Sequence, residues 1–143
     1  MRDNMGTEYK SIRDVEFGEE LPIYLPDTSL KKSAEFAALV GWEGARFSDH
    51  EKAKEEGLAG AMVPGILNQA YFSAMIHTWA PNSNLLSIDT IFRAPVIADQ
   101  EYSMQATVTD IDEDAGIIEI DLVMSNQKKE TRVLGTARIS LKT

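Results

Sequence analysis

The sequence has 143 residues, 43% hydrophobic and 26% charged, which predicts one globular domain with a substantial core. Its formal net charge of −9 argues against nucleic acid as a partner, because phosphate binding depends on clustered Lys and Arg. The chain has no cysteine, which excludes disulfides, thiolate catalysis and cysteine-based metal sites. It also has neither a long apolar run nor a charged-then-apolar leader, so we expect no membrane span, no signal peptide and a cytoplasmic location.

The first part of the chain predicts an N-terminal arm and an edge strand. Residues 1–14 are polar and mixed in charge, and we expect a loose arm or an edge strand there. We take residues 1–16 as this N-terminal arm, followed by a single domain over residues 17–143. Residues 21–26 (LPIYLP) are typical of a short strand, which their prolines limit to the edge of a sheet.

Two short helices are predicted next from their capping residues. Thr28 or Ser29 caps a helix that runs to about residue 40, and Gly41 ends it as a left-handed residue. Asp49 caps a shorter helix, HEKAKEE, which ends at Gly57. We expect His50, which follows that cap, to point to solvent.

The segment from Pro64 to Pro81 predicts one long helix, around which the rest of the chain is organised. Pro64 suits the first turn and Pro81 stops the helix. Apolar side chains recur at the helical spacing of three and four, and this predicts a buried stripe of Ile66, Leu67, Ala70, Tyr71, Ala74, Met75 and Trp79.

Four strand-like segments follow this helix and predict an antiparallel sheet. They cover residues 84–94, 101–109, 117–125 and 133–141, and the last three alternate apolar and polar residues. The acidic segment 110–116 is interpreted as a solvated turn, and two isolated histidines make no metal site, so we expect no metal. The predicted class is α+β, with a sheet of about five or six strands wrapped around one helix.

A resemblance to a known family rests on residues 47–67, FSDHEKAKEEGLAGAMVPGIL. This segment resembles the MaoC-like branch of the hotdog fold, where His-x-Asp, a helix with Ala and Gly, and an apolar stretch lead to His-Gly-Met-Leu. The residues that match the pattern in register are Asp49, Ala53, Gly57, Gly65 and Leu67. Two positions depart from it: Ile66 stands in place of Met, and Pro64 in place of His. The resemblance extends more weakly over residues 17–142, including FRAPV at 92–96. The family includes (R)-specific enoyl-CoA hydratases and 3-hydroxyacyl dehydratases.

The family's catalytic pair is missing by this register. The hydratases carry Asp-x-Asn-Pro-x-His, whose carboxylate and imidazole can share one water as acid and base. The aspartate position falls on Trp42, the asparagine position on Gly44 and the histidine position on Phe47. Neither aromatic side chain can exchange a proton at working pH. The resemblance therefore implies a hotdog protein without the family dyad.

The resemblance leaves a set of substrate-binding candidates. Gly65 and Ile66 open the central helix, where the family's thioester carbonyl accepts main-chain hydrogen bonds. Arg93 either meets a phosphate of the ligand or is an ordinary surface residue, and Arg46 either faces the ligand or forms a surface ion pair. Asn68 is a polar residue one turn into the helix that contacts backbone or ligand.

The resemblance implies three functional hypotheses. We favour a subunit that binds acyl-CoA or another acyl thioester without a cofactor, as a homodimer or as a heterodimer with a dyad-bearing homologue, because hotdog protomers build pockets across their interface. The alternative is an active hydratase, dehydratase or thioesterase that uses Glu43, Asn68 or His77. The third is a structural dimer with a blocked pocket.

Overall fold

The computed structural model of the chain describes residues 9–42 and 44–143. Within these ranges three α-helices precede four strands: α1 (Leu30–Leu39), α2 (His50–Glu55), α3 (Gly65–Trp79), β1 (Asn84–Phe92), β2 (Tyr102–Asp112), β3 (Ile117–Asn126) and β4 (Thr131–Ser140). Each helix in the described ranges is too short or too polar to cross a membrane.

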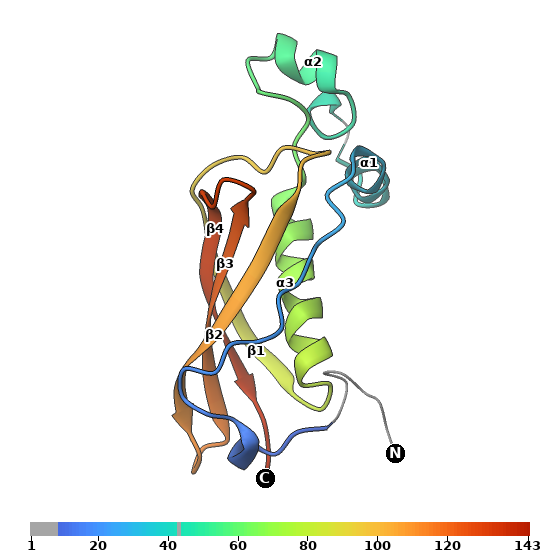
Figure 1. Cartoon of the computed structure of the whole chain (residues 1–143). Helices are drawn as coiled ribbons and strands as arrows, with labels where there is room; N and C mark the ends of the chain where they lie inside the picture. Colours follow the sequence, from blue (N-terminus) through green and yellow to red (C-terminus); the bar gives the residue numbers. More distant parts are fainter. Residues whose placement is uncertain (1–8, 43) are drawn as a thin grey trace, which may run out of the picture.

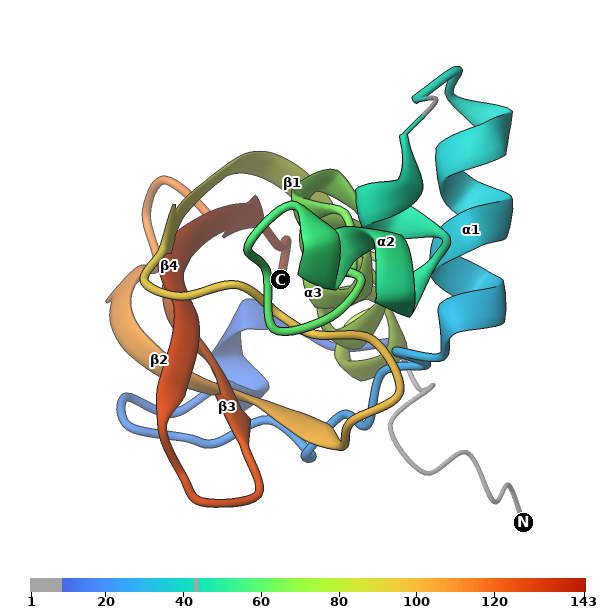
Figure 2. The same cartoon turned by 90° about the horizontal axis from the view of Figure 1, so that it is seen from above.

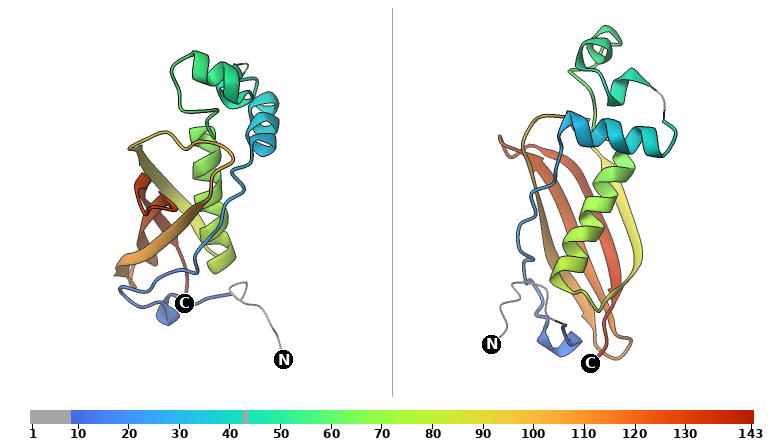
Figure 3. Two further views of the ribbon diagram at one scale, coloured as in Figure 1. Left: turned by 45° about the horizontal axis from the view of Figure 1, so that its top comes forward. Right: turned by 90° about the vertical axis from the view of Figure 1, so that its right-hand side faces the viewer.

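The strands form one antiparallel sheet in the order β1-β4-β3-β2. The sheet curves around α3, which lies along its concave face (Figure 1; Figure 3, right). The predicted α+β architecture is confirmed. The expected strand number is not reached, because the segment after residue 20 adds only two isolated bridges to β2, Glu20 to Thr107 and Tyr24 to Met104. Pro22 lies between those bridges and has no N–H to donate to a ladder.

The inner face of the sheet follows the predicted alternation. Every second side chain is buried against α3, and these residues are Tyr102, Met104, Ala106 and Val108 of β2, Ile118, Ile120, Leu122 and Met124 of β3, and Val133, Ala137 and Ile139 of β4. Successive strand residues point to opposite faces, so a period of two specifies this face without further information.

The buried face of α3 differs from the predicted stripe. Leu67, Met75 and Trp79 are buried as expected, but Ile66 is 53% exposed and Ala70 is also exposed. The core-facing residues that the prediction omitted are Asn68, Phe72 and Ile76. The helix is apolar on most of its circumference, so its period alone does not select the side that meets the sheet.

The segment before residue 17 also differs from the loose arm that we expected. Ile12 and Val15 are buried in the core cluster, and Ser11 and Asp14 form a capping box around a short 3-10 turn. The Lys10 ammonium lies 5.3 Å from the centroid of the Trp79 ring. Residues 1–8 of the arm lie outside the described ranges, and the boundary at residue 17 stays a prediction.

Helices α1 and α2 lie beyond the N-terminal end of α3 (Figures 1 and 2). Their predicted caps are confirmed: Ser29 Oγ accepts a hydrogen bond from the Lys32 N–H, and Asp49 Oδ1 accepts one from the Lys52 N–H. Gly41 and Gly57 follow the two helices with φ values of 78° and 95°, a conformation that favours glycine. We refer to residues 29–57 as the overhanging segment.

Candidate functional site

The start of α3 presents free main-chain donors. Pro64 is the N-cap residue, with extended backbone (φ −55°, ψ 138°), and its carbonyl accepts hydrogen bonds from the N–H groups of Leu67 and Asn68. The N–H groups of Gly65 and Ile66 have no acceptor among residues 9–42 and 44–143. The helix dipole adds partial positive charge at this end, so the site suits a carbonyl oxygen or an anion.

A cavity of about 350 Å³, here called the α3 cavity, lies beside these donors. It is lined by Met62, Val63, Gly65, Asn68, Phe92, Arg93, Ala94, Pro95 and Val96. The structure thus brings together three of the predicted substrate-binding residues, Gly65, Asn68 and Arg93. Ile66 does not line the cavity, because its side chain is on the exposed side of α3.

Gly65 allows the Phe92 ring to pack closely against the start of α3. A Cβ atom added there would lie 3.1 Å from Cζ of Phe92, whose ring covers this side of the glycine. The exposed residue Arg93 follows Phe92, and its N–H donates to the carbonyl of Arg132. No ion pair of the Arg93 guanidinium is formed within the described part of the chain.

Trp42 and Phe47, on which the sequence register places the family's dyad, pack together in the overhanging segment. The ring centroids of Trp42 and Phe47 are 5.6 Å apart, and Phe36 meets the indole edge-on at 6.4 Å. Trp42 and Phe47 line a second, open cavity of about 530 Å³ together with Gly44, Arg46 and Glu56. The pair therefore lines an apolar surface and offers no acid or base.

Arg46 forms an ion pair with Glu56, with 3.4 Å between Nη2 and Oε1, and both side chains are about half exposed. Its backbone carbonyl accepts a hydrogen bond from the Met62 N–H at 2.6 Å. Because Met62 lines the α3 cavity, this bond joins the overhanging segment to the wall of that cavity.

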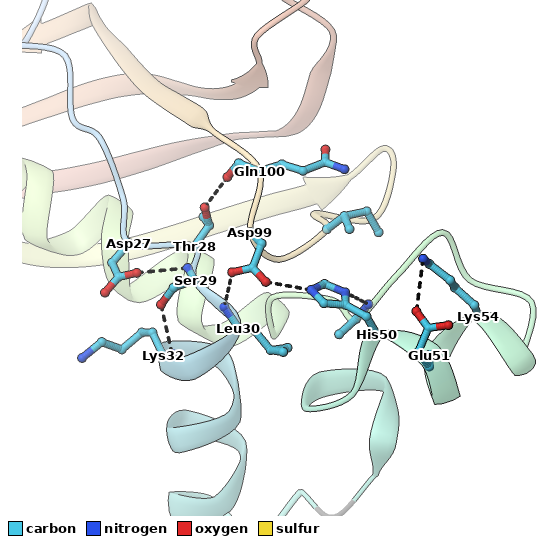
Figure 4. Close-up of polar contacts among 12 residues, drawn as sticks. Asp27, Thr28, Ser29, Leu30, Lys32, His50, Glu51, Lys54, Asp99 and Gln100 are labelled. Carbon is cyan, nitrogen blue, oxygen red and sulfur yellow. Dashed lines mark hydrogen bonds and ion pairs between the residues drawn. The ribbon is translucent and has the colours of Figure 1, made fainter.

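His50 is held in place by two hydrogen bonds, contrary to the solvent-facing position that we expected (Figure 4). Its Nδ1 accepts from the Ala61 N–H at 3.0 Å, so Nε2 carries the proton and donates to Oδ2 of Asp99 at 2.8 Å. The other carboxylate oxygen of Asp99 accepts from the Leu30 N–H. Since both ring nitrogens have partners, this pair clamps α1, α2 and the β1–β2 loop together and has no free base.

Asp99 was missed by the sequence analysis, because its partner His50 lies 49 residues away in the chain and no local pattern links the two. The φ of Asp99, 67°, lies in the left-handed region, which Asp and Asn tolerate in turns. The hydrogen bond from His50, followed by that from Leu30, lowers the pKa of the Asp99 carboxyl.

The remaining two candidates lie away from the α3 cavity or outside the description. Glu43 is not among the described residues. His77 is exposed in the last turn of α3, and the twelve residues that separate it from Gly65 correspond to about 18 Å along a helix axis. It therefore cannot touch a group bound at the start of the helix.

The outer edge of β1 is open and carries exposed apolar side chains on both faces of the strand. Within the described ranges β1 pairs only with β4, so its other edge carries free main-chain groups. The β1 edge surface is defined here as this edge with the exposed side chains Ile66, Leu85, Leu86, Ile91 and Phe92. Gln69 Nε2 donates to Thr90 Oγ1 at 2.7 Å and fixes α3 against the strand.

Comparison with known proteins finds its matches among solved structures. The sequence matches no protein-family model, and no curated protein matches it. The (R)-hydratase from A. caviae involved in PHA biosynthesis superimposes with a TM-score of 0.84 at 23% identity, over 90% of this chain and 98% of that protein. R-hydratase PhaJ1 from Pseudomonas aeruginosa gives a TM-score of 0.84 at 21% identity, over 92% and 85% of the two chains.

A heteromeric assembly is among the further neighbours. A chain of the ChsH1–ChsH2 complex from Mycobacterium tuberculosis matches with a TM-score of 0.80 at 19% identity, over 89% of this chain and 98% of that one. MaoC-like dehydratases follow with TM-scores of 0.81 and 0.78. The chain therefore has the hotdog fold, which it shares with (R)-hydratases and MaoC-like dehydratases.

Proposed function

We propose that this chain belongs to the MaoC-like family and binds an acyl thioester such as acyl-CoA at the start of α3. The observation that carries the proposal is the pair of free main-chain donors at Gly65 and Ile66 beside the mostly apolar α3 cavity. The donors suit the thioester carbonyl, and the apolar lining suits an acyl chain. Arg93 at the rim supplies a positive charge for a phosphate of the carrier.

We further propose that the chain does not catalyse hydration alone. By the sequence register, Trp42 and Phe47 stand at the positions of the family's Asp and His, and their rings pack against each other. Asn68 has a polar side chain in the cavity and follows the free donors Gly65 and Ile66 closely in the sequence. A carboxamide, however, neither gives nor accepts a proton at working pH. The binding groups are thus kept without an acid–base pair.

A partner chain completes the proposal. The β1 edge surface combines unpaired strand groups with exposed apolar side chains, a combination that pairs readily with another strand. The partner is a second copy of this chain or a homologue that carries the Asp/His dyad. The heteromeric ChsH1–ChsH2 neighbour supports the second case. We expect the assembly to be cytoplasmic.

Two measurements on the pure chain test the proposal. Titration calorimetry should detect binding of crotonyl-CoA, and a hydration assay with the same ligand should show no turnover above background. Adding a dyad-bearing homologue should restore turnover above that of the homologue alone. If no acyl-CoA binds, only the structural-dimer hypothesis remains.

A further inference from the structure

A buried amide oxygen without a partner lies in the wall of the α3 cavity. Asn68 is 1% exposed and lines the cavity, and its Oδ1 accepts no hydrogen bond from any described residue. A buried acceptor that stays unpaired is destabilising, so natural proteins rarely keep one without a reason. Ser33 Oγ and Arg132 Nε are also buried and unpaired, but neither residue lines this cavity.

The position of Asn68 on the helix places this acceptor beside the free donors. Asn68 follows Gly65 by three residues, so the two lie on the same face of α3. Helical side chains lean toward the N-terminus, and the carboxamide therefore lies over the first turn. The wall of the cavity thus includes Gly65, which has a free N–H, and Asn68, which has an unpaired acceptor. Its apolar members include Val63, Phe92 and Val96.

We propose that Asn68 determines ligand specificity by accepting a hydrogen bond from an O–H or N–H group of the bound thioester close to its carbonyl. This inference rests on the proposed function. Two parts of an acyl thioester can supply the donor: a hydroxyl group on the acyl chain, or the amide N–H of the thiol arm of the carrier. A ligand without a donor at this position would leave Oδ1 desolvated and unpaired, and this disfavours binding of that ligand.

Calorimetry with butyryl-CoA and with each enantiomer of 3-hydroxybutyryl-CoA tests the inference on wild type and Asn68→Leu. If the hydroxyl is the donor, wild type binds one hydroxylated ligand at least about fivefold more tightly than butyryl-CoA, and Asn68→Leu abolishes that preference. If the amide is the donor, Asn68→Leu weakens the binding of all three ligands by the same factor. Ser33→Ala removes a buried unpaired hydroxyl outside the cavity and should change none of the three affinities.

The inference is wrong if Asn68→Leu binds all these ligands as wild type does. If Asn68→Leu fails to fold by circular dichroism, Asn68→Met replaces it, because the flexible methionine adapts to the space. Wild type alone gives an independent test through two comparisons. The first compares 3-hydroxybutyryl-CoA with butyryl-CoA, and the second compares S-butyryl-N-acetylcysteamine with the amide-free S-ethyl thiobutyrate. Equal affinities in both comparisons also overturn the inference. A wild type that binds no thioester overturns the proposed function itself.

Discussion

The rings of Trp42 and Phe47 lie against each other, with centroids 5.6 Å apart and planes inclined by 37°. The resemblance to MaoC-like hydratases places an aspartate and a histidine at these positions. An aromatic pair of this kind contributes about 0.5–1.5 kcal/mol beyond the apolar area that it buries. If this register is right, the chain has a packing contact where the family has an acid–base pair, and the following variant tests that register.

We predict that the double variant Trp42→Asp, Phe47→His gains measurable hydration of crotonyl-CoA. Each single variant should gain little, because the two groups act on one water as a unit. Trp42 is 40% exposed, so we expect the fold to survive, and circular dichroism should verify this before activity is compared. Turnover by wild type that disappears in Glu43→Gln or His77→Ala would instead favour the active-enzyme hypothesis.

Gly65→Val should lower acyl-CoA affinity at least about tenfold. The branched side chain would meet the Phe92 ring, since even a Cβ lies 3.1 Å from its Cζ, and would cover the approach to the free N–H groups. Gly65→Ala should have a smaller effect, because the ring can shift by a few tenths of an ångström. Calorimetry measures both, and unchanged affinity in Gly65→Val would remove the helix start from the binding site.

Arg93→Ala should weaken acyl-CoA binding and flatten its dependence on salt concentration. A cation that meets a phosphate contributes attraction that salt screens. Arg13→Ala removes the same charge from an ion pair with Glu113 in the N-terminal segment and is the matched control. Calorimetry at low and high salt separates the two variants. Parallel salt dependence in Arg93→Ala and wild type would contradict a phosphate contact.

Ile91→Lys should prevent association through the β1 edge surface. Ile91 is 58% exposed on the open edge strand, and an edge lysine opposes strand pairing by its charge. Light scattering at micromolar concentration should give a dimer for wild type and a monomer for the variant. Leu39→Lys replaces an 84% exposed leucine on α1 and should leave the dimer intact. A monomeric wild type would mean that the chain does not pair with itself, leaving the heterodimer as the case to test.

Gly135→Ala should destabilise the fold by roughly 1–3 kcal/mol or more. A Cβ at Gly135 would lie 2.1 Å from the carbonyl oxygen of Asp89 on the neighbouring strand, so backbone must move to admit it. Gly44→Ala is the control, because nothing lies within 4 Å of the added atom and the backbone there is extended. Denaturant unfolding compares the two, and equal midpoints would contradict the close approach of β1 and β4.

Asp99→Asn should cost stability at neutral pH and cost less in acid. Because the pKa of Asp99 is lowered on folding, the stability that its charge contributes is fully present above the unfolded value of about 3.8. That contribution is lost as the pH falls through the lower pKa of the folded state. The difference between the unfolding free energies of wild type and variant should therefore begin to shrink below about pH 4, and its charge-dependent part should vanish once the pH is below the folded-state pKa. A difference that is independent of pH would assign the effect to packing alone.

The sequence by itself determined the elements whose signals are local. The caps Ser29 and Asp49 mark helix starts through hydrogen bonds from residues three positions later, and Pro81 marks a helix end because it has no N–H to donate. The period of two fixed the inner faces of β2, β3 and β4. The spacing of residues 47–67 also carried the fold resemblance, because the turns and helix starts in that stretch depend on neighbouring residues.

Only the tertiary structure decided which side of α3 is buried and which distant residues meet. Ile66 and Phe72 are equally apolar, and the curvature of the sheet selected Phe72 for the core and left Ile66 exposed. His50 and Asp99 are 49 residues apart, so no local pattern links them. The oxygen of Asn68 is buried and unpaired because the end of β1 and the loop after it form the cavity around this side chain. Contacts of this kind depend on how the chain returns to itself, which sequence periodicity does not encode.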